Sequence, residues 1–182
     1  LVLSLLLTWQ GVPSTFDGAK QITPIDAAAN VKEQIIPVGP VAPMVAIKQL
    51  GTNGGGWYGP NSAVPLENPT PLSNLFELIS IVLIPMAIVF MMGRFTRHPK
   101  LSLLTFGVMA FFSLAFIGSA VWSESQPNVA AHGLAAAQPN MEGKEQRFGP
   151  VTSALWSTLT TQTSNGSVNA MHDSLNPVAG LV

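Results

Sequence analysis

The sequence predicts an all-α, polytopic membrane protein, and three observations carry that prediction. Of its 182 residues, 47% are hydrophobic and only 9% are charged, whereas a soluble domain usually carries about 25% charge. Two apolar runs, at about residues 72–95 and 101–122, are each long enough to cross a bilayer, which takes about 20 residues. Residues 93–100 between them hold three Lys or Arg residues and no acid, as cytoplasmic loops do.

The same composition excludes several classes of function. The chain has no cysteine, so a disulfide framework, a thiolate metal site and a Cys nucleophile are all ruled out. A formal net charge of −1 offers no basic surface, and we expect no nucleic-acid partner. No Walker-type phosphate-binding motif occurs, so we do not expect this chain to hydrolyse ATP.

In the first half, residues 1–9 predict the outer end of a span, with Trp9 at the interface. Residues 11–40 are rich in Pro, Gly and small polar residues, which predicts irregular external chain. Residues 41–51 predict a short helix of about three turns, half a membrane deep. This helix leads into the glycine-rich loop 52–56, and the first full span follows at about 72–95.

The second half repeats this order. A span at about 101–122 is followed by a short helix at about 150–162, a polar loop at 163–167 and the start of another apolar run. Because the chain opens and closes inside apolar runs, we interpret it as an internal fragment of a longer membrane protein. We therefore divide it into two units, residues 1–97 and 98–182.

The two polar loops form an internal repeat. Thr-Asn-Gly-Gly at 52–55 aligns with Ser-Asn-Gly-Ser at 164–167, at a constant offset of 112 residues. In each unit the loop is followed by Asn-Pro, at 68–69 and 176–177, which leads into an apolar run. Two such loops in matching context are harder to explain as chance turns than either loop alone.

Hydroxyl, amide and backbone oxygens supply cation ligands without fixed charge. Backbone carbonyls can replace the hydration shell of a monovalent cation, and glycine allows the dihedrals that such a loop needs. We therefore predict two walls of an ion-selectivity filter, although Asn-Gly is also a common turn pair and ordinary external turns remain the alternative. The predicted ligand residues are Thr52, Asn53, Gly54, Ser164, Asn165 and Gly166.

Three longer strings resemble one known family. They are Gly-Thr-Asn-Gly-Gly-Gly at 51–56 followed by Glu-Asn-Pro-Thr-Pro-Leu at 67–72, Asn-Met-Glu-Gly-Lys-Glu-Gln-Arg-Phe-Gly at 140–149, and Gly-Ser-Val-Asn-Ala-Met-His-Asp-Ser at 166–174. On these strings the chain resembles KdpA, the potassium-binding subunits of bacterial Kdp potassium-transporting P-type ATPases, in the superfamily of potassium transporters. The resemblance covers essentially all 182 residues.

The resemblance implies four span–pore-helix–span units in the full subunit, of which this chain would hold the second and third. It implies that K⁺ is the transported ion and that ATP is used only by a KdpB-like partner, with KdpC-like and KdpF-like subunits completing the complex. The expected location is the bacterial plasma (inner) membrane, with the filter loops open to the external or periplasmic side. Asn165 departs from the family pattern, in which Cys is common at this place.

Two alternatives in function remain from the sequence alone. One is a passive or ion-coupled K⁺ transporter of the same superfamily without an ATPase partner, and the other is a structural membrane subunit. Two acids also allow two interpretations each. Glu67 could attract cations or be a solvated loop residue, and Glu77 could serve conduction or pack through hydrogen bonds. For His172 and Asp173 we expect a hydrogen bond that braces the loop.

Overall fold

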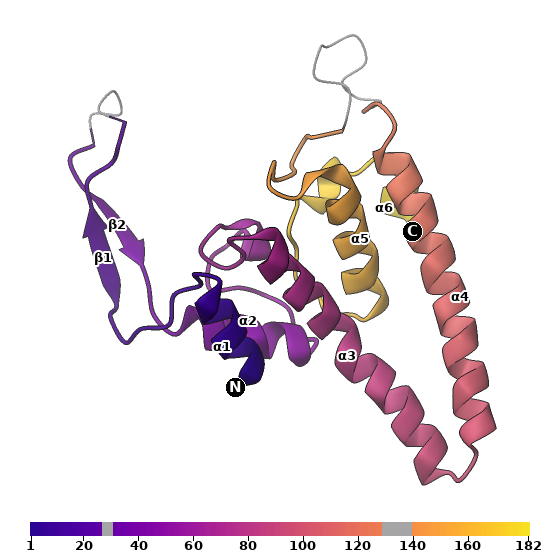
Figure 1. Ribbon diagram of the computed structural model, residues 1–182. Coiled ribbons are helices and arrows are strands. Elements are labelled where there is room, and N and C mark those ends of the chain that lie inside the picture. The colour runs from indigo at the N-terminus through magenta and orange to yellow at the C-terminus, as the bar shows by residue number, and fades with distance from the viewer. Residues whose placement is uncertain (27–30, 129–139) are drawn as a thin grey trace.

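Two long apolar helices dominate the computed structural model, which describes residues 1–26, 31–128 and 140–182. Helix α3 (Pro71–Phe95) and helix α4 (Pro99–Glu124) are joined by a short turn and diverge from it as a V (Figure 1). Both are long and apolar enough to cross a membrane, and most of the surface of α4 is exposed. The predicted helical membrane architecture is thus confirmed.

Helix α3 begins where its sequence provides a complete cap. The Thr70 hydroxyl accepts the Ser73 backbone N–H, and the Ser73 hydroxyl accepts the Thr70 N–H, each over 3.0 Å. Pro71 occupies the first helical position, where its missing N–H costs nothing. Pro85 lies inside the helix without ending it, as a membrane helix allows.

The N-terminal segment packs against the first half of α3. Helix α1 (Val2–Trp9) and helix α2 (Val41–Leu50) share an apolar core that Phe76 of α3 adjoins. Leu7 and Val45 are fully buried in this core. Helix α2 is the short helix expected at about 41–51, and it begins directly after Pro40.

Helix α5 (Gly149–Gln162) lies between the arms of the V (Figure 1). Its buried Trp156 packs with Leu78 and Ile81 of α3. On its other side Ala154 meets Ala120 of α4 and Ala179 of the short helix α6 (Pro177–Leu181). Small side chains at that second contact let the helices approach closely.

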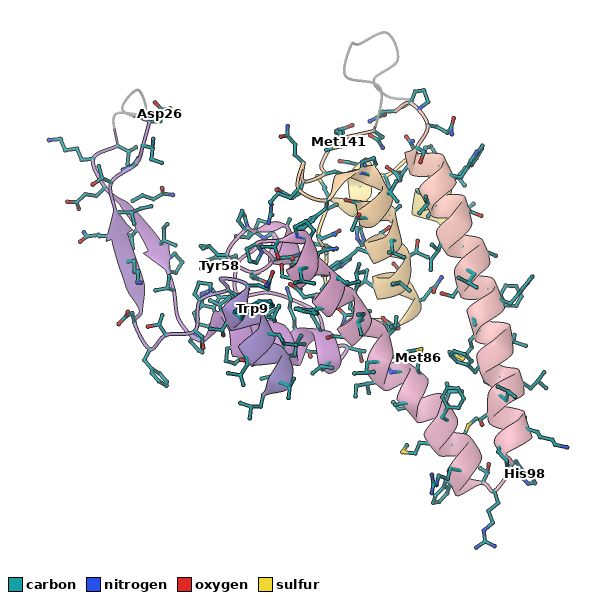
Figure 2. All side chains as sticks on the ribbon, in the orientation of Figure 1. Trp9, Asp26, Tyr58, Met86, His98 and Met141 are labelled. Carbon is teal, nitrogen blue, oxygen red and sulfur yellow. The ribbon has the colours of Figure 1, made fainter. Side chains whose placement is uncertain are left out.

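A β-hairpin interrupts the region that we expected to be irregular. Strand β1 (Ala19–Ile22) pairs antiparallel with β2 (Gln34–Pro37), with Ala19 opposite Pro37 and Ile22 opposite Gln34. The expectation for residues 11–40 is therefore wrong at these strands, because Pro and Gly content averaged over thirty residues hides two short runs that contain Ile. The hairpin projects away from the helices (Figure 1), and its side chains are mostly exposed (Figure 2).

Candidate functional site: two glycine-rich loops and the polar network behind them

The two short helices end in the same way. After α2, the Thr52 N–H donates to the Gln49 carbonyl oxygen over 3.5 Å. After α5, the Ser164 N–H donates to the Thr161 carbonyl oxygen over 3.1 Å. These pairs are related by the offset of 112 residues found in the sequence, so the repeat extends to backbone hydrogen bonding.

The backbone of the two loops also follows one pattern. Thr52 and Ser164 have φ values of 51° and 55°, and Gly54 and Gly166 have φ values of 61° and 82°. Asn53 and Asn165, which lie between them, keep negative φ. A left-handed conformation is uncommon for any residue except glycine and is strained for a β-branched one. Such strain in Thr52 points to a functional requirement on the loop.

An alternating sign of φ has a consequence for the peptide groups. In both loops the N–H groups are directed at the end of the preceding helix. Thr52 and Gly54 donate to the carbonyl oxygens of Gln49 and Lys48, and Ser164 and Asn165 donate to those of Thr161 and Thr160. Five loop carbonyl oxygens accept no hydrogen bond from any of the described residues. These carbonyls belong to Thr52, Asn53, Ser164, Asn165 and Gly166.

The loops lie against each other although they are far apart in the sequence. A Cβ atom added to Gly54 would lie 2.8 Å from the backbone nitrogen of Ser167, and closer still to the Asn165 carbonyl oxygen. Only glycine fits this contact. Gly166, by contrast, has open space where a Cβ would stand. The structure thus brings the two predicted walls into direct backbone contact at Gly54.

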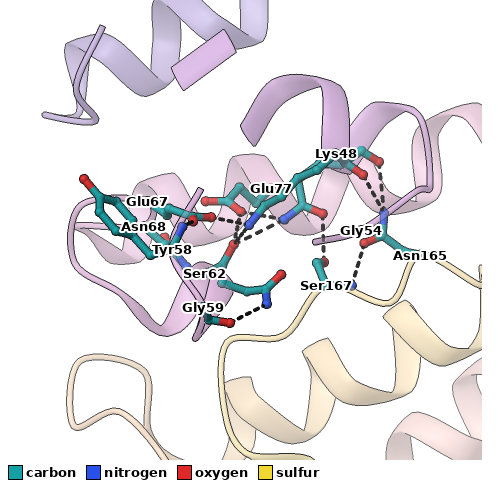
Figure 3. A network of polar contacts seen from close by, with 12 residues as sticks. Lys48, Gly54, Tyr58, Gly59, Ser62, Glu67, Asn68, Glu77, Asn165 and Ser167 are labelled. Atoms are coloured by element: carbon teal, nitrogen blue, oxygen red, sulfur yellow. Dashed lines mark hydrogen bonds and ion pairs between the residues drawn. The ribbon is translucent and has the colours of Figure 1, made fainter. Parts of the chain in front are cut away.

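Asn165 joins its own loop to the helix that precedes the other loop. Its Nδ2 atom donates to the carbonyl oxygens of Lys48 and Gln49 over 3.2 Å each, and its Oδ1 accepts the Ser167 N–H over 3.1 Å. The side chain is buried and is directed at the end of α2 (Figure 3). The side-chain amide therefore links the second loop to α2, the helix that carries the first loop. The backbone carbonyl of Asn165, like those of Ser164 and Gly166, accepts no hydrogen bond from the described residues.

A buried polar network lies behind the loops (Figure 3). The Ser167 hydroxyl donates to Gln49 Oε1 over 2.9 Å, and Gln49 Nε2 donates to Glu77 Oε2 over 2.6 Å. The Ser62 hydroxyl also donates to Glu77 Oε2 over 2.6 Å. Glu77 thus packs through hydrogen bonds, which was one of its two interpretations.

An ion pair extends the network. Lys48 Nζ lies 2.5 Å from Glu67 Oε2 and donates to the Ser62 hydroxyl over 2.7 Å. Glu67 is fully buried and also accepts the Tyr58 N–H over 2.7 Å. Neither expectation for Glu67 holds, because its carboxylate is neither solvated nor open to ions. Burial, together with the negative charge of Glu67, raises the pKa of Tyr58 above its usual 10.0.

A second network fixes the outer end of the other unit. Glu124, at the end of α4, is fully buried and lies 2.8 Å from Lys144 Nζ. The Asn140 side chain donates to the same carboxylate over 2.8 Å, and the Asn176 N–H donates to its other oxygen over 2.5 Å. The string at 140–149 therefore anchors the start of α6 to the end of α4.

Arg147, from the same string, joins the two units. Its guanidinium group donates to the backbone carbonyls of Ala63, over 2.6 Å, and Asn68. Glu145 lies 3.3 Å from it and accepts a further bond.

His172, in the 3₁₀ turn His172–Ser174, behaves differently from our expectation, since its buried Nε2 has no hydrogen-bond partner among the described residues. Burial lowers the pKa of His172 below its usual 6.5.

Sequence reasoning missed Lys48 and Gln49 as part of the site. A signal was present, because two adjacent polar residues, one of them ionisable, stand in a short helix that is otherwise apolar. Ionisable residues at membrane depth are rare and are normally paired. The partner, Glu67, lies 19 residues away, and no local pattern identifies it.

Comparison with known proteins identifies the family. The family described as "KdpA: Potassium-transporting ATPase A subunit" matches residues 1–182. A protein of Pseudomonas entomophila named "Potassium-transporting ATPase potassium-binding subunit" is 51% identical over 183 residues, which cover 100% of this chain and 32% of that protein. Identically named proteins of Bacteroides fragilis and Solidesulfovibrio magneticus are 48% and 46% identical, over 100% and 99% of this chain and 32% and 34% of their own lengths.

The chain therefore spans about a third of the length of the curated relatives it matches. The family match and the relatives agree over the whole chain, and the resemblance noted in the sequence is confirmed by both. The chain belongs to the KdpA family, the A subunits of potassium-transporting ATPases.

Proposed function

We propose that the loops after α2 and α5 are two walls of a K⁺ filter. The observation that carries the proposal is the shared backbone. Residues 52–54 and 164–166 alternate in the sign of φ, both loops follow helix ends with the same hydrogen bond, and the loops are in contact at Gly54. The proposed ligand atoms are the oxygens of Thr52, Asn53, Gly54, Ser164, Asn165 and Gly166.

The chemistry is selection by dehydration. Loop carbonyls that have no internal hydrogen bond can replace water around K⁺. Both α2 and α5 end at their loop, so the partly negative C-terminus of each helix favours a cation there. No carboxylate needs to touch the ion, because Glu67 and Glu77 are held by Lys48, Gln49 and Ser62.

For the full subunit, we propose that K⁺ enters from the external side and passes to an ATP-hydrolysing, KdpB-like partner, with KdpC-like and KdpF-like subunits in the same complex. The names of the relatives, potassium-binding subunits of a potassium-transporting ATPase, support K⁺ as the substrate. The basic turn at 93–100 supports an arrangement with that turn in the cytoplasm of a bacterial cell, and the filter loops then face the periplasm.

The test uses two glycines with matched backbone. Gly166 and Gly149 have φ values of 82° and 71°, and both have open space for a Cβ. Alanine at either position brings a similar left-handed strain of about 1–2 kcal/mol, but only Gly166 lies in the proposed filter. The full-length subunit, with its partners, would support growth of cells that lack other K⁺ uptake.

We expect Gly166→Ala to raise the K⁺ concentration needed for half-maximal growth about tenfold, the factor that corresponds to about 1.4 kcal/mol. Gly149→Ala should grow like the parent. Gly54→Ala should lose growth at low K⁺, because its Cβ would collide with the second loop. Normal growth of both loop variants, in complexes that assemble, would mean that the loops are ordinary turns.

A further inference from the structure

Gln49 contacts both loops and is not one of the proposed ligands. It is fully buried in the last turn of α2, the helix that carries the first loop. Its side chain reaches the second loop, where Oε1 accepts the Ser167 hydroxyl over 2.9 Å. Its backbone carbonyl accepts both the Thr52 N–H and the Asn165 amide. Its Nε2 donates to Glu77 Oε2 over 2.6 Å and to the Ser62 hydroxyl over 3.4 Å, so one residue contacts both loops, α3 and the 61–63 turn.

The orientation of the Gln49 amide follows from its neighbours. The Glu77 carboxylate, 2.6 Å from Nε2, can only accept a hydrogen bond while it is ionised. The amide nitrogen faces Glu77 and also donates to the Ser62 hydroxyl over 3.4 Å, which leaves Oε1 as the acceptor for Ser167. Glu77 is itself held by the Ser62 hydroxyl, so α3 and the 61–63 turn fix the position of the Gln49 side chain.

Ser167 transmits this constraint to the second loop. Its hydroxyl is held by Gln49, and its carbonyl oxygen accepts Trp156 Nε1 over 3.0 Å and the Thr160 hydroxyl over 2.8 Å. The residue next to Gly166 is thus clamped between α5 on one side and α2 on the other. Ser167 is fully buried, and hydrogen bonds on both sides restrict the positions that it can take.

We propose that Gln49 is a positioning residue that sets the separation of the two loops and thereby the preference of the site for K⁺ over larger monovalent cations such as Rb⁺. This inference rests on the proposed function of the loops as filter walls. Gln49 acts through Ser167 and through the end of α2, and it does not touch the ion. Ion preference depends on the size and stiffness of the oxygen cage, which a loosened clamp would change.

The experiment measures initial uptake of K⁺ and of Rb⁺ at a series of concentrations, in cells that carry the full complex as their K⁺ uptake system. The variants are Gln49→Leu, Ser167→Ala and the double variant. Gln49→Leu keeps the volume but removes the side-chain hydrogen bonds to Ser167, Glu77 and Ser62. The matched control is Ser153→Ala. Among the described residues, this buried hydroxyl bonds only to the Gly149 carbonyl at the start of its own helix. Gly166→Ala is measured in the same assay.

We expect the ratio of the Rb⁺ KM to the K⁺ KM to fall about tenfold in Gln49→Leu and about threefold in Ser167→Ala, in line with the net effect of one or two buried hydrogen bonds. Maximal uptake rates should stay within about twofold of the parent value, because only ion preference is altered. The double variant should match Gln49→Leu, because Ser167→Ala removes a hydrogen bond that Gln49→Leu has already removed, the one between Ser167 and Gln49. Ser153→Ala should keep the parent ratio.

An unchanged ratio in Ser167→Ala, with Gly166→Ala impaired, would overturn the role of Gln49 and leave the filter standing. An equal change in Ser153→Ala would also overturn it, since any buried hydroxyl would then have the same effect. If Gly166→Ala transports like the parent, the filter proposal itself fails, and the role of Gln49 fails with it. Ser167→Ala removes a single hydroxyl, so it keeps the test decisive if Gln49→Leu does not assemble.

Discussion

Buried charges are unusual in a chain with only 9% charged residues. Four of them are paired in the interior: Lys48 with Glu67, and Lys144 with Glu124. Each pair links a helix to a segment about twenty residues away along the chain, which places it where a loop must be held against a helix. Removing one partner of such a pair leaves the other charge unpaired and buried, and this costs about 3–5 kcal/mol.

At the scale of one residue, we expect Lys48→Met to lower the stability of the full subunit by about 3–5 kcal/mol, because Glu67 then stays buried without its cation. The double variant Lys48→Met/Glu67→Leu should recover much of that loss, since no charge remains to be desolvated. Thermal unfolding of the purified subunit in detergent measures both. Lys100→Met, at an exposed lysine beside the α3–α4 turn, is the control.

Equal loss in the single and double variants would contradict this account. It would mean that the contacts of the Lys48 stem, or its bond to Ser62, matter more than the charge of Glu67.

Residues of the site differ in how far the sequence predicted them. A repeated pattern predicted Thr52, Gly54, Ser164 and Gly166, because the residues that form each loop are adjacent in the sequence. The sequence did not predict the residues behind the loops, because contacts such as that of Gln49 with Ser167 join residues 118 positions apart. Burial inverted the expectation for Glu67, whose local sequence of Pro and Asn is typical of a solvated loop. The assignment of the loops to a filter stays a prediction.

At the scale of elements, hydropathy and turn residues predicted where the helices lie. The spans expected at about 72–95 and 101–122 are α3, at Pro71–Phe95, and α4, at Pro99–Glu124. Long apolar runs are a strong signal because a helix satisfies its own backbone in a membrane. The β-hairpin was missed because two strands of four residues carry little pattern of their own. How the elements join was also beyond the sequence.

Arg147 provides one such join, and we expect Arg147→Lys to weaken it. The guanidinium group donates to two carbonyls, those of Ala63 and Asn68, in the other unit. A lysine keeps the charge but loses the planar fork that serves both. The expected loss is about 1–3 kcal/mol, as for hydrogen bonds to a charged group. Arg94→Lys, at an exposed residue near the end of α3, should be neutral.

Unfolding of the full subunit, followed by the fluorescence of its tryptophans, measures the difference. Equal stability of Arg147→Lys and the parent would show that the bonds to Ala63 and Asn68 do not hold the units together.

At the scale of the whole molecule, the chain is about a third of the length of its relatives. Thr52 is partly exposed, and Asn53, Ser164 and Gly166 lie on the surface of the chain. Two loops in contact do not enclose an ion. We propose that two further walls come from the remainder of the full subunit.

We therefore expect the purified 182-residue chain in detergent neither to fold stably alone nor to bind K⁺ tightly. Titration calorimetry with K⁺ should give no saturable heat, whereas the full complex should. Because α4 exposes large side chains such as Phe111 and Leu114, the isolated chain should also aggregate without detergent. Tight K⁺ binding by the isolated chain would overturn the need for further walls.

The shared backbone of the two loops also bears on how such a site can evolve. The loops have the same residue at their centre, yet the Asn53 amide bonds within its own loop to Gly54, while the Asn165 amide bonds across to α2. Because both loops are encoded separately in one polypeptide, a single mutation changes a residue of one loop and leaves the sequence of the other unchanged. In an assembly of identical subunits, the same mutation would change every copy of the loop at once. A single chain that carries both loops can therefore change them one at a time, and under the proposed function each change would alter one part of the filter.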